Sequence, residues 1–326
     1  RRIQNSHIAA ALFPLDDILI QPKFFAPLPP PLESGEFHYD RLITRLLPYL
    51  PDVPEILSPL GWPQIGPEEL LRSNARIALV GSPGSGKTVS LHVLANTLLT
   101  KSTNKRYPIL LHILDLDLSQ PDPYLALALA HYNSKDGRLV KEIRAFFEEK
   151  LAHGEAVLLV DGLDQLPKSE VDLRVSFIRT LLEKHPGLPV VLAASGDYLD
   201  GLLEIGFEVI GLAAWSRSDR AQLIDRWTQA WQADVATKLA LTSSNSQSTR
   251  PEILTAWLQQ DQEILSPMEL SLKIWGAFSG DLAGGSPHTF YLAFLLRLLE
   301  SDHLDKGLCA SALQTIQSNA PFLVST

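Results

Sequence analysis

The chain has 326 residues and a mass of 36.0 kDa, which excludes a single small domain and suits one large domain or two moderate ones. Hydrophobic residues make up 45% and charged residues 20%, so a sizeable core is expected and wholesale disorder is disfavoured. The net charge of -9 has the wrong sign for a broad nucleic-acid-binding face, and the single cysteine, Cys309, excludes an intrachain disulfide. We therefore expect a cytoplasmic protein with no cysteine-based metal site and no nucleic acid as partner.

Prolines are concentrated at the start of the chain, where 12 of the 23 fall within the first 67 residues. Such a density blocks long helices and central strands. We expect residues 1–66 to form an extended connector with one short helix near 39–47, and we expect no membrane-spanning segment. Because Met268 is the only methionine, we also expect the chain to be a piece of a longer protein.

Regular structure is expected from Pro67, because a proline followed by Glu68 and Glu69 suits the first turn of a helix. Five apolar runs then have the composition of buried strands, at 76–80, 108–113, 156–160, 189–193 and 207–210. Helical segments lie between them, at 88–99, 138–151 and 171–184. Strands that alternate with helices predict an α/β fold with a mostly parallel five-stranded sheet covered on both faces.

The strand pattern ends after Gly211, and only helices are predicted beyond it, at 216–231, 251–265, 267–278 and 289–299. An all-α helical subdomain should therefore follow the sheet, with its tryptophans packed in its core. The predicted organisation is a proline-rich connector over 1–66, a nucleotide-binding sheet domain over 67–212 and a helical subdomain over 213–326.

A glycine-rich motif directly follows the first predicted strand and directly precedes a predicted helix. Its residues are Gly81, Ser82, Pro83, Gly84, Ser85, Gly86, Lys87 and Thr88, which match G-x-x-x-x-G-K-[ST]. Glycines let the backbone curl so that amide groups point at phosphate oxygens, and the helix adds its positive N-terminal end. We predict a three-layer P-loop NTPase in which this loop, together with Val89, binds ATP or ADP. Lys87 would bridge the β- and γ-phosphates, and the Thr88 hydroxyl would bind Mg²⁺.

Other interpretations of this stretch are weaker. A chance glycine-rich turn is disfavoured by the complete motif and by both flanking elements. A dinucleotide site would need its third glycine at Val89 and would leave Lys87 and Thr88 unexplained. Guanine recognition is disfavoured as well, because the stretches 104–107 and 237–240 lack the aspartate of a guanine-binding motif. Adenine is the favoured base.

A carboxylate, Asp161, ends the third predicted strand. This arrangement places an acid beside the phosphate loop, where Asp161 would hold Mg²⁺ together with Thr88, directly or through water. An isolated aspartate at a strand end could also cap a turn, but the preceding loop favours the metal role. Asp164 is a candidate to polarise an attacking water, and a plain turn residue is its alternative.

The run from Asp161 to Gln165 resembles the NACHT family of signal-transducing NTPases, in which the strand ends in Asp, then a small residue, an apolar residue and an Asp-Glu pair. The resemblance covers about residues 67–300 in order and spacing. The stretch 265–270 is similar to the proline-centred motif of the family's helical subdomain, which implies that Pro267 packs near the adenine. Residues 14–27 resemble the connector that bacterial members carry behind an N-terminal effector.

Two features depart from the family pattern. Gln165 stands where the family has Glu, and an amide cannot accept a proton as a carboxylate does, so hydrolysis would be slow or absent. The stretch 193–197 lacks the arginine that senses the γ-phosphate in the family, and Arg217 and Arg220 are better explained as a solvated helix face. Asp164 and Gln165 remain the candidate catalytic residues.

The resemblance implies an ATP-binding signal-transduction switch with slow hydrolysis. Its nucleotide state would control self-association through the NTPase region and would activate covalently attached effector and sensor domains, with bacterial defence as one setting. A hydrolysis-deficient scaffold that keeps its nucleotide bound is the main alternative. An AAA-type motor is a weaker one, because no arginine finger is visible and the charge is acidic.

Overall fold

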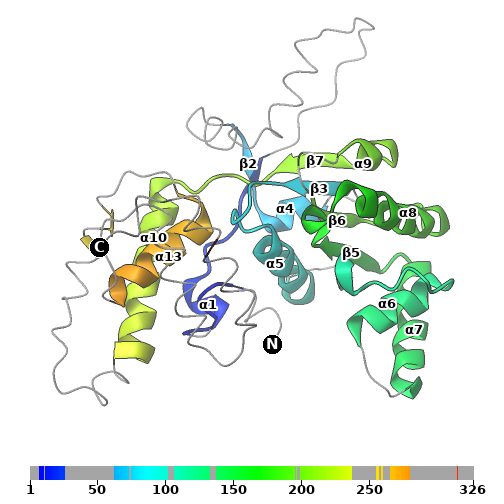
Figure 1. Ribbon diagram of the computed structural model, residues 1–326, viewed down its shortest axis with the longest axis horizontal. Helices are drawn as coiled ribbons and strands as arrows, with labels where there is room; N and C mark the ends of the chain where they lie inside the picture. The colour runs from blue at the N-terminus through cyan, green and yellow to red at the C-terminus, as the bar shows by residue number, and fades with distance from the viewer. Residues whose placement is uncertain are drawn as a thin grey trace, which may run out of the picture. The chain divides into compact units, whose positions relative to one another are not determined.

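The computed structural model (Figure 1) describes residues 7–10, 12–25, 62–72, 75–101, 106–132, 137–194, 196, 199–236, 255–256, 258–259, 265–279 and 314. The chain forms two compact units. One comprises residues 21–214 and is called the sheet unit; the other comprises residues 1–20 and 215–326 and is called the helical unit.

The sheet unit is built on five parallel strands in the spatial order β4-β5-β6-β3-β7. They are β3 (Arg76–Val80), β4 (Tyr107–His112), β5 (Ala156–Asp161), β6 (Val190–Ala194) and β7 (Glu208–Gly211). Every residue of β5 and β6 is buried, as expected where both faces of a parallel sheet are covered. The prediction of a parallel five-stranded α/β sheet is confirmed.

Helices cover both faces of this sheet and complete three layers (Figure 1). They are α4 (Pro67–Arg72), α5 (Lys87–Thr100), α6 (Pro123–His131), α7 (Gly137–Ala152), α8 (Lys168–Lys184) and α9 (Asp200–Glu204). The apolar side chains of α4 and α5 share one core with one face of the sheet. Those of the other four helices pack on the opposite face. The loop between β3 and α5 follows the last residue of β3, so it lies at the carboxyl edge of the parallel sheet.

The sheet unit also incorporates part of the proline-rich start of the chain. A short strand, β1 (Phe24–Phe25), pairs antiparallel with β2 (Gln64–Ile65). Phe24 also forms a bridge to Leu212 directly after β7, and both phenylalanine side chains are buried. Phe24 and Phe25 therefore belong to the core of the sheet unit. The short helix expected near 39–47 lies outside the described residues.

A polar cluster joins α6 to the end of α8. The hydroxyl of Tyr124 and Nε2 of His185 lie 3.0 Å apart, and two cations, Lys184 and Arg144, approach the face of the Tyr124 ring. Arg144 is in turn paired with Asp122 and Glu148. Burial, and secondly the charge of Lys184, lower the pKa of His185 below its ordinary value of 6.5. The neutral imidazole is therefore the form that the fold favours.

This cluster predicts a loss of stability in mild acid. Because the folded-state pKa of His185 is lower than the unfolded one, the unfolded chain binds the proton more tightly. The contribution of neutral His185 to the free energy of unfolding is fully present above about pH 6.5. It is lost as the pH falls through that value towards the lower folded-state pKa. When urea midpoints are measured between about pH 5 and 8, the midpoint should fall less steeply with decreasing pH in His185→Gln than in the unmodified chain. His153→Gln, at an exposed histidine, is the control, and equal slopes in all three proteins would refute the assignment.

The helical unit contains α1 (Leu15–Ile18), α10 (Arg217–Ala230), the π-helical turn η6 (Trp231–Ala236) and α13 (Pro267–Phe278). Capping boxes start both long helices, from Ser216 and from Ser266. The Trp227 ring is fully buried and meets Phe13 edge-on at 5.1 Å, so Phe13 belongs to the same core as α10.

The helices predicted at 216–231 and 267–278 are confirmed. The helix predicted at 251–265 lies mostly, and the one at 289–299 entirely, outside the described residues. No helix within the described ranges combines the length and the apolar character needed to cross a membrane.

Candidate functional site

The glycine loop connects the carboxyl end of β3 to the first residue of α5. Gly84 and Gly86 have φ angles of 78° and 99°, which side-chain-bearing residues adopt only at a cost. Gly86 is also the N-cap of α5, and its carbonyl accepts hydrogen bonds from the amide and the hydroxyl of Ser90. The first amides of a helix have no partners within the helix, so the loop presents them, together with the positive end of α5, to an anion.

The first glycine of the loop is closely packed against a side chain of the same loop. A Cβ atom on Gly81 would lie 2.6 Å from Oγ of Ser85, which is well inside van der Waals contact. Oγ of Ser85 is itself shielded from solvent and has no hydrogen-bond partner among the described residues. Buried hydroxyls normally have a partner, so an unpaired hydroxyl at the centre of a glycine loop fits a bound anion such as a phosphate.

Lys87 is the cation of the loop, and only 7% of its side chain is exposed. Its Nζ atom donates to the carbonyl oxygens of Gly81, at 2.6 Å, and Ser82, at 3.3 Å, and it lies 3.0 Å from Oδ2 of Asp164. Two carbonyls and a carboxylate thus hold the ammonium group at the mouth of the loop. A buried ammonium needs negative partners, and a phosphate could replace the carboxylate in that role.

The two side chains that the sequence assigned to a metal are in contact. Oγ1 of Thr88, in the first turn of α5, donates to Oδ1 of Asp161 at 3.1 Å, and Asp161 is 8% exposed at the end of β5. Mg²⁺ takes six oxygens at about 2.1 Å, which puts neighbouring ligands about 3 Å apart. The two oxygens therefore have the spacing of adjacent Mg²⁺ ligands.

Thr88 and Asp161 do not form a complete metal site by themselves. Within the described part of the chain, no group of three or more His, Cys, Asp or Glu side chains could hold a metal ion. Mg²⁺ is typically bound by one or two protein oxygens together with phosphate and water oxygens. The donor set therefore fits a metal that arrives with a nucleotide.

The family comparison covers this whole arrangement. Residues 75–230 match the family model of the NACHT domain. The match runs from just before β3 to the end of α10 and includes the glycine loop, Asp161 and the turn that follows it. Residues 75–230 are a NACHT domain. NACHT domains are P-loop NTPases of the STAND type, so the chain carries a nucleotide-binding domain.

Solved structures give two further comparisons. The structure of PCH-2 from C. elegans matches with a TM-score of 0.37 and 14% identity, over 80% of this chain and 67% of that one. A structure that describes katanin self-assembly matches with a TM-score of 0.37 and 19% identity, over 87% of this chain and 83% of that one. A comparison with curated proteins gives no match. The two structural likenesses concern the fold alone.

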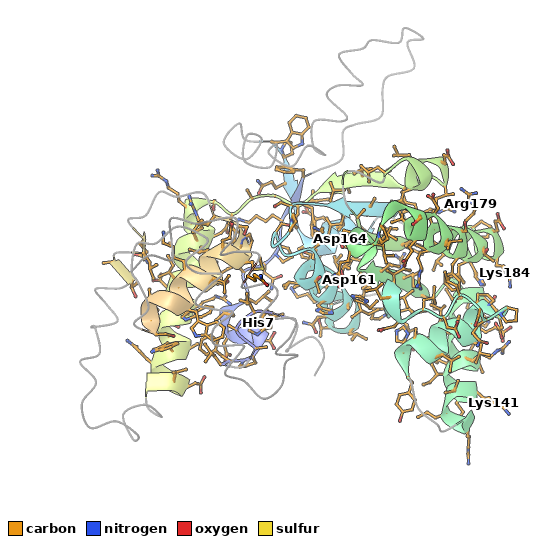
Figure 2. The ribbon with its side chains drawn as sticks, in the orientation of Figure 1. His7, Lys141, Asp161, Asp164, Arg179 and Lys184 are labelled. Atoms are coloured by element: carbon orange, nitrogen blue, oxygen red, sulfur yellow. The ribbon has the colours of Figure 1, made fainter. Side chains whose placement is uncertain are left out.

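The turn behind β5 brings one of the two candidate catalytic residues of the NACHT domain to the loop. Figure 2 shows Asp161 and Asp164 at the same end of the sheet, beside α5. Asp164 lies in the short η4 turn (Leu163–Gln165), is 21% exposed and pairs with Lys87. The side chain of Gln165 is exposed. The structure therefore joins Asp164, and not Gln165, to the phosphate loop.

The remaining candidates lie elsewhere in the chain. Pro267 is the first residue of α13 in the helical unit, where it follows the Ser266 cap. The side chain of Arg217 is exposed at the start of α10. Ser195 and Asp197, after the fourth strand of the NACHT domain, lie outside the described residues.

One residue beside the site escaped the sequence reasoning. His112 ends β4, and its Cα atom is the register partner of Asp161 on β5. Its ring packs on Gly162, the first residue of the turn that carries Asp164. A histidine at the end of a strand was the only signal in the sequence, and nothing local indicated that β4 is the neighbour of β5.

Proposed function

We propose that the chain binds ATP or ADP with Mg²⁺ at the glycine loop and works as a nucleotide-controlled switch. The observation that carries the proposal is the buried ammonium of Lys87, held at a loop whose central hydroxyl, Oγ of Ser85, has no partner. A buried cation and an unpaired donor at a helix N-terminus together select a multiply charged anion.

Each group at the loop has a separate role in this proposal. Lys87 would exchange the Asp164 carboxylate for phosphate oxygens, and Ser85 would donate its hydroxyl to one of them. Thr88 and Asp161 would hold Mg²⁺, which when bound neutralises phosphate charge. Pro267 is proposed to contact the adenine, on the strength of the sequence resemblance alone.

The ion pair between Lys87 and Asp164 suggests how the site would sense its nucleotide. A phosphate that takes over Lys87 releases Asp164, which is then free to orient a water molecule for attack. Asp164 and the η4 turn would thus differ between nucleotide states, and differential contacts of this kind are what a switch needs. By resemblance to the family, the readout would be self-association and activation of an attached effector.

A hydrolysis-deficient scaffold is the second candidate, and the amide of Gln165 favours it. General-base catalysis contributes about 10²- to 10⁴-fold to a rate, and an amide cannot supply it. In that case the nucleotide would remain bound and would stabilise the fold by mass action.

Nucleotide content and phosphate release of the purified chain test both candidates. We expect bound ADP or ATP, slow phosphate release, and a rise of about tenfold or more in Gln165→Glu. Asp164→Ala should abolish release, while Asp172→Ala, at an exposed carboxylate on α8, should not change it.

The outcomes separate the candidates. Bound nucleotide with no turnover, even in Gln165→Glu, would select the scaffold. Turnover that vanishes in Asp164→Ala would exclude the inert scaffold. A chain that binds neither nucleotide would contradict both.

A further inference from the structure

His112 lies on the same face of the sheet as the nucleotide site. Its register partner on the parallel neighbour β5 is Asp161, and paired residues of parallel strands point to the same face. The residue two before His112, Leu110, packs against the core shared with α5, as do Val157 and Leu159 on β5. His112 therefore points to the face that carries the glycine loop, next to Asp161.

The His112 ring occupies the space beside the turn. A Cβ atom added to Gly162 would lie 2.8 Å from Cε1 and 2.9 Å from Nε2 of this ring, so the ring rests against the backbone of the turn. Gly162 has a φ of 84°, a conformation that suits glycine, and it leads directly into Asp164. Neither ring nitrogen of His112 has a hydrogen-bond partner among the described residues, so the contact is one of packing.

The strand end that bears His112 is itself held in place. Arg174 on α8 donates to the carbonyls of Ile113, at 2.7 Å, and Leu116, at 2.5 Å, in and after the η3 turn (Ile113–Asp115) that follows β4. Helix α8 begins shortly after the η4 turn. Arg174 thus ties α8 to the segment that directly follows His112, from the opposite face of the sheet.

We propose that His112 is a positioning residue of the nucleotide site. Its ring holds the Gly162 turn so that Asp161 stays against Thr88 and Asp164 stays against Lys87. This inference rests on the proposed function, since it names a residue that supports the same Mg²⁺ site. It predicts that the ring matters for the metal-dependent part of nucleotide affinity, because the ring packs on the residue that directly follows Asp161, a proposed Mg²⁺ ligand.

The test compares ADP affinity with Mg²⁺ and with a chelator. His112→Ala should weaken ADP binding about tenfold in Mg²⁺, the size of effect typical for residues that orient metal ligands, and by less than about twofold without metal. His112→Phe keeps a ring on Gly162 and should restore most of the loss. His153→Ala, at an exposed histidine, should match the unmodified chain. Equal losses with and without metal, or no loss at all, would overturn the proposal.

A stability cycle separates this inference from the proposed function. Gly162→Ala should lower the urea midpoint because it adds both backbone strain and a clash with the ring. The loss should be smaller in the His112→Ala background, where only the strain remains, and such non-additivity reports a direct contact. In a chain that bound no nucleotide the proposed function would fail, yet the cycle would still decide whether the ring holds the turn. Additive losses would overturn the positioning role.

Discussion

Lys87→Ala is expected to weaken the binding of ATP by about 100-fold or more. The Lys87 side chain is 7% exposed and its ammonium group already lies among two carbonyls and a carboxylate, so it is preorganised for phosphate oxygens. A hydrogen bond to a charged group is worth about 1.5–3 kcal/mol, and each 1.4 kcal/mol is a factor of ten in affinity. Loss of contacts to two phosphates therefore costs at least about two orders of magnitude. Isothermal titration calorimetry in Mg²⁺ measures the change directly.

Lys101→Ala is the matched control for this variant. Lys101 directly follows α5, is 65% exposed and pairs with Glu68 at the surface. Its removal should change nucleotide affinity by less than about twofold, because an exposed ion pair is worth little. Unchanged affinity in Lys87→Ala, in a chain with normal far-ultraviolet circular dichroism, would show that the glycine loop is not the nucleotide site.

Phe24→Ala is expected to cost about 3–5 kcal/mol in the free energy of unfolding, a large share of the 5–15 kcal/mol that holds a typical domain together. The Phe24 side chain is 0% exposed, lies in the core formed by α4, α5 and the sheet, and neighbours Leu212, which it bridges. Truncation would leave a cavity in a close-packed region, and the surroundings would relax only in part. Urea titration followed by fluorescence and circular dichroism gives the change.

Leu99→Ala provides the comparison for Phe24→Ala. Leu99 is a large apolar residue on α5 in the same unit, but 65% of it is exposed. Its truncation should change the free energy of unfolding by no more than about 0.5 kcal/mol. A cost below about 1 kcal/mol for Phe24→Ala would mean that β1 is only loosely attached to the sheet unit.

The elements that the sequence predicted well are those whose signal is local. The run at 76–80 coincides with β3; β5 extends one residue beyond its predicted end, and the other three strands are displaced from prediction by one residue at both ends. One difference has a simple cause. The apolar run predicts a strand from Pro189, but proline has no amide hydrogen for the ladder, and β6 begins at Val190.

Helix α6 was missed because its sequence carries no periodic signal. Its run of Ala and Leu is apolar all round, and a helix of that kind is recognised by burial and not by an amphipathic pattern. Ala126, Leu127 and Ala128 are all fully buried in the core on the far face of the sheet. The N-cap at Asp122, followed by proline, was the one available signal.

The phosphate loop and the acidic strand end could be found from sequence because each is a short run of consecutive residues with a recognisable pattern. The residues that they contact in the fold could not be found in this way. Thr88 and Asp161 are 73 residues apart, and their contact depends on the order β5-β6-β3 in the sheet. Lys87 with Asp164, His112 with Gly162 and Phe24 with Leu212 are likewise joined only by tertiary structure. Sequence patterns report on neighbours within a few residues, whereas strand order and register decide which strand ends meet.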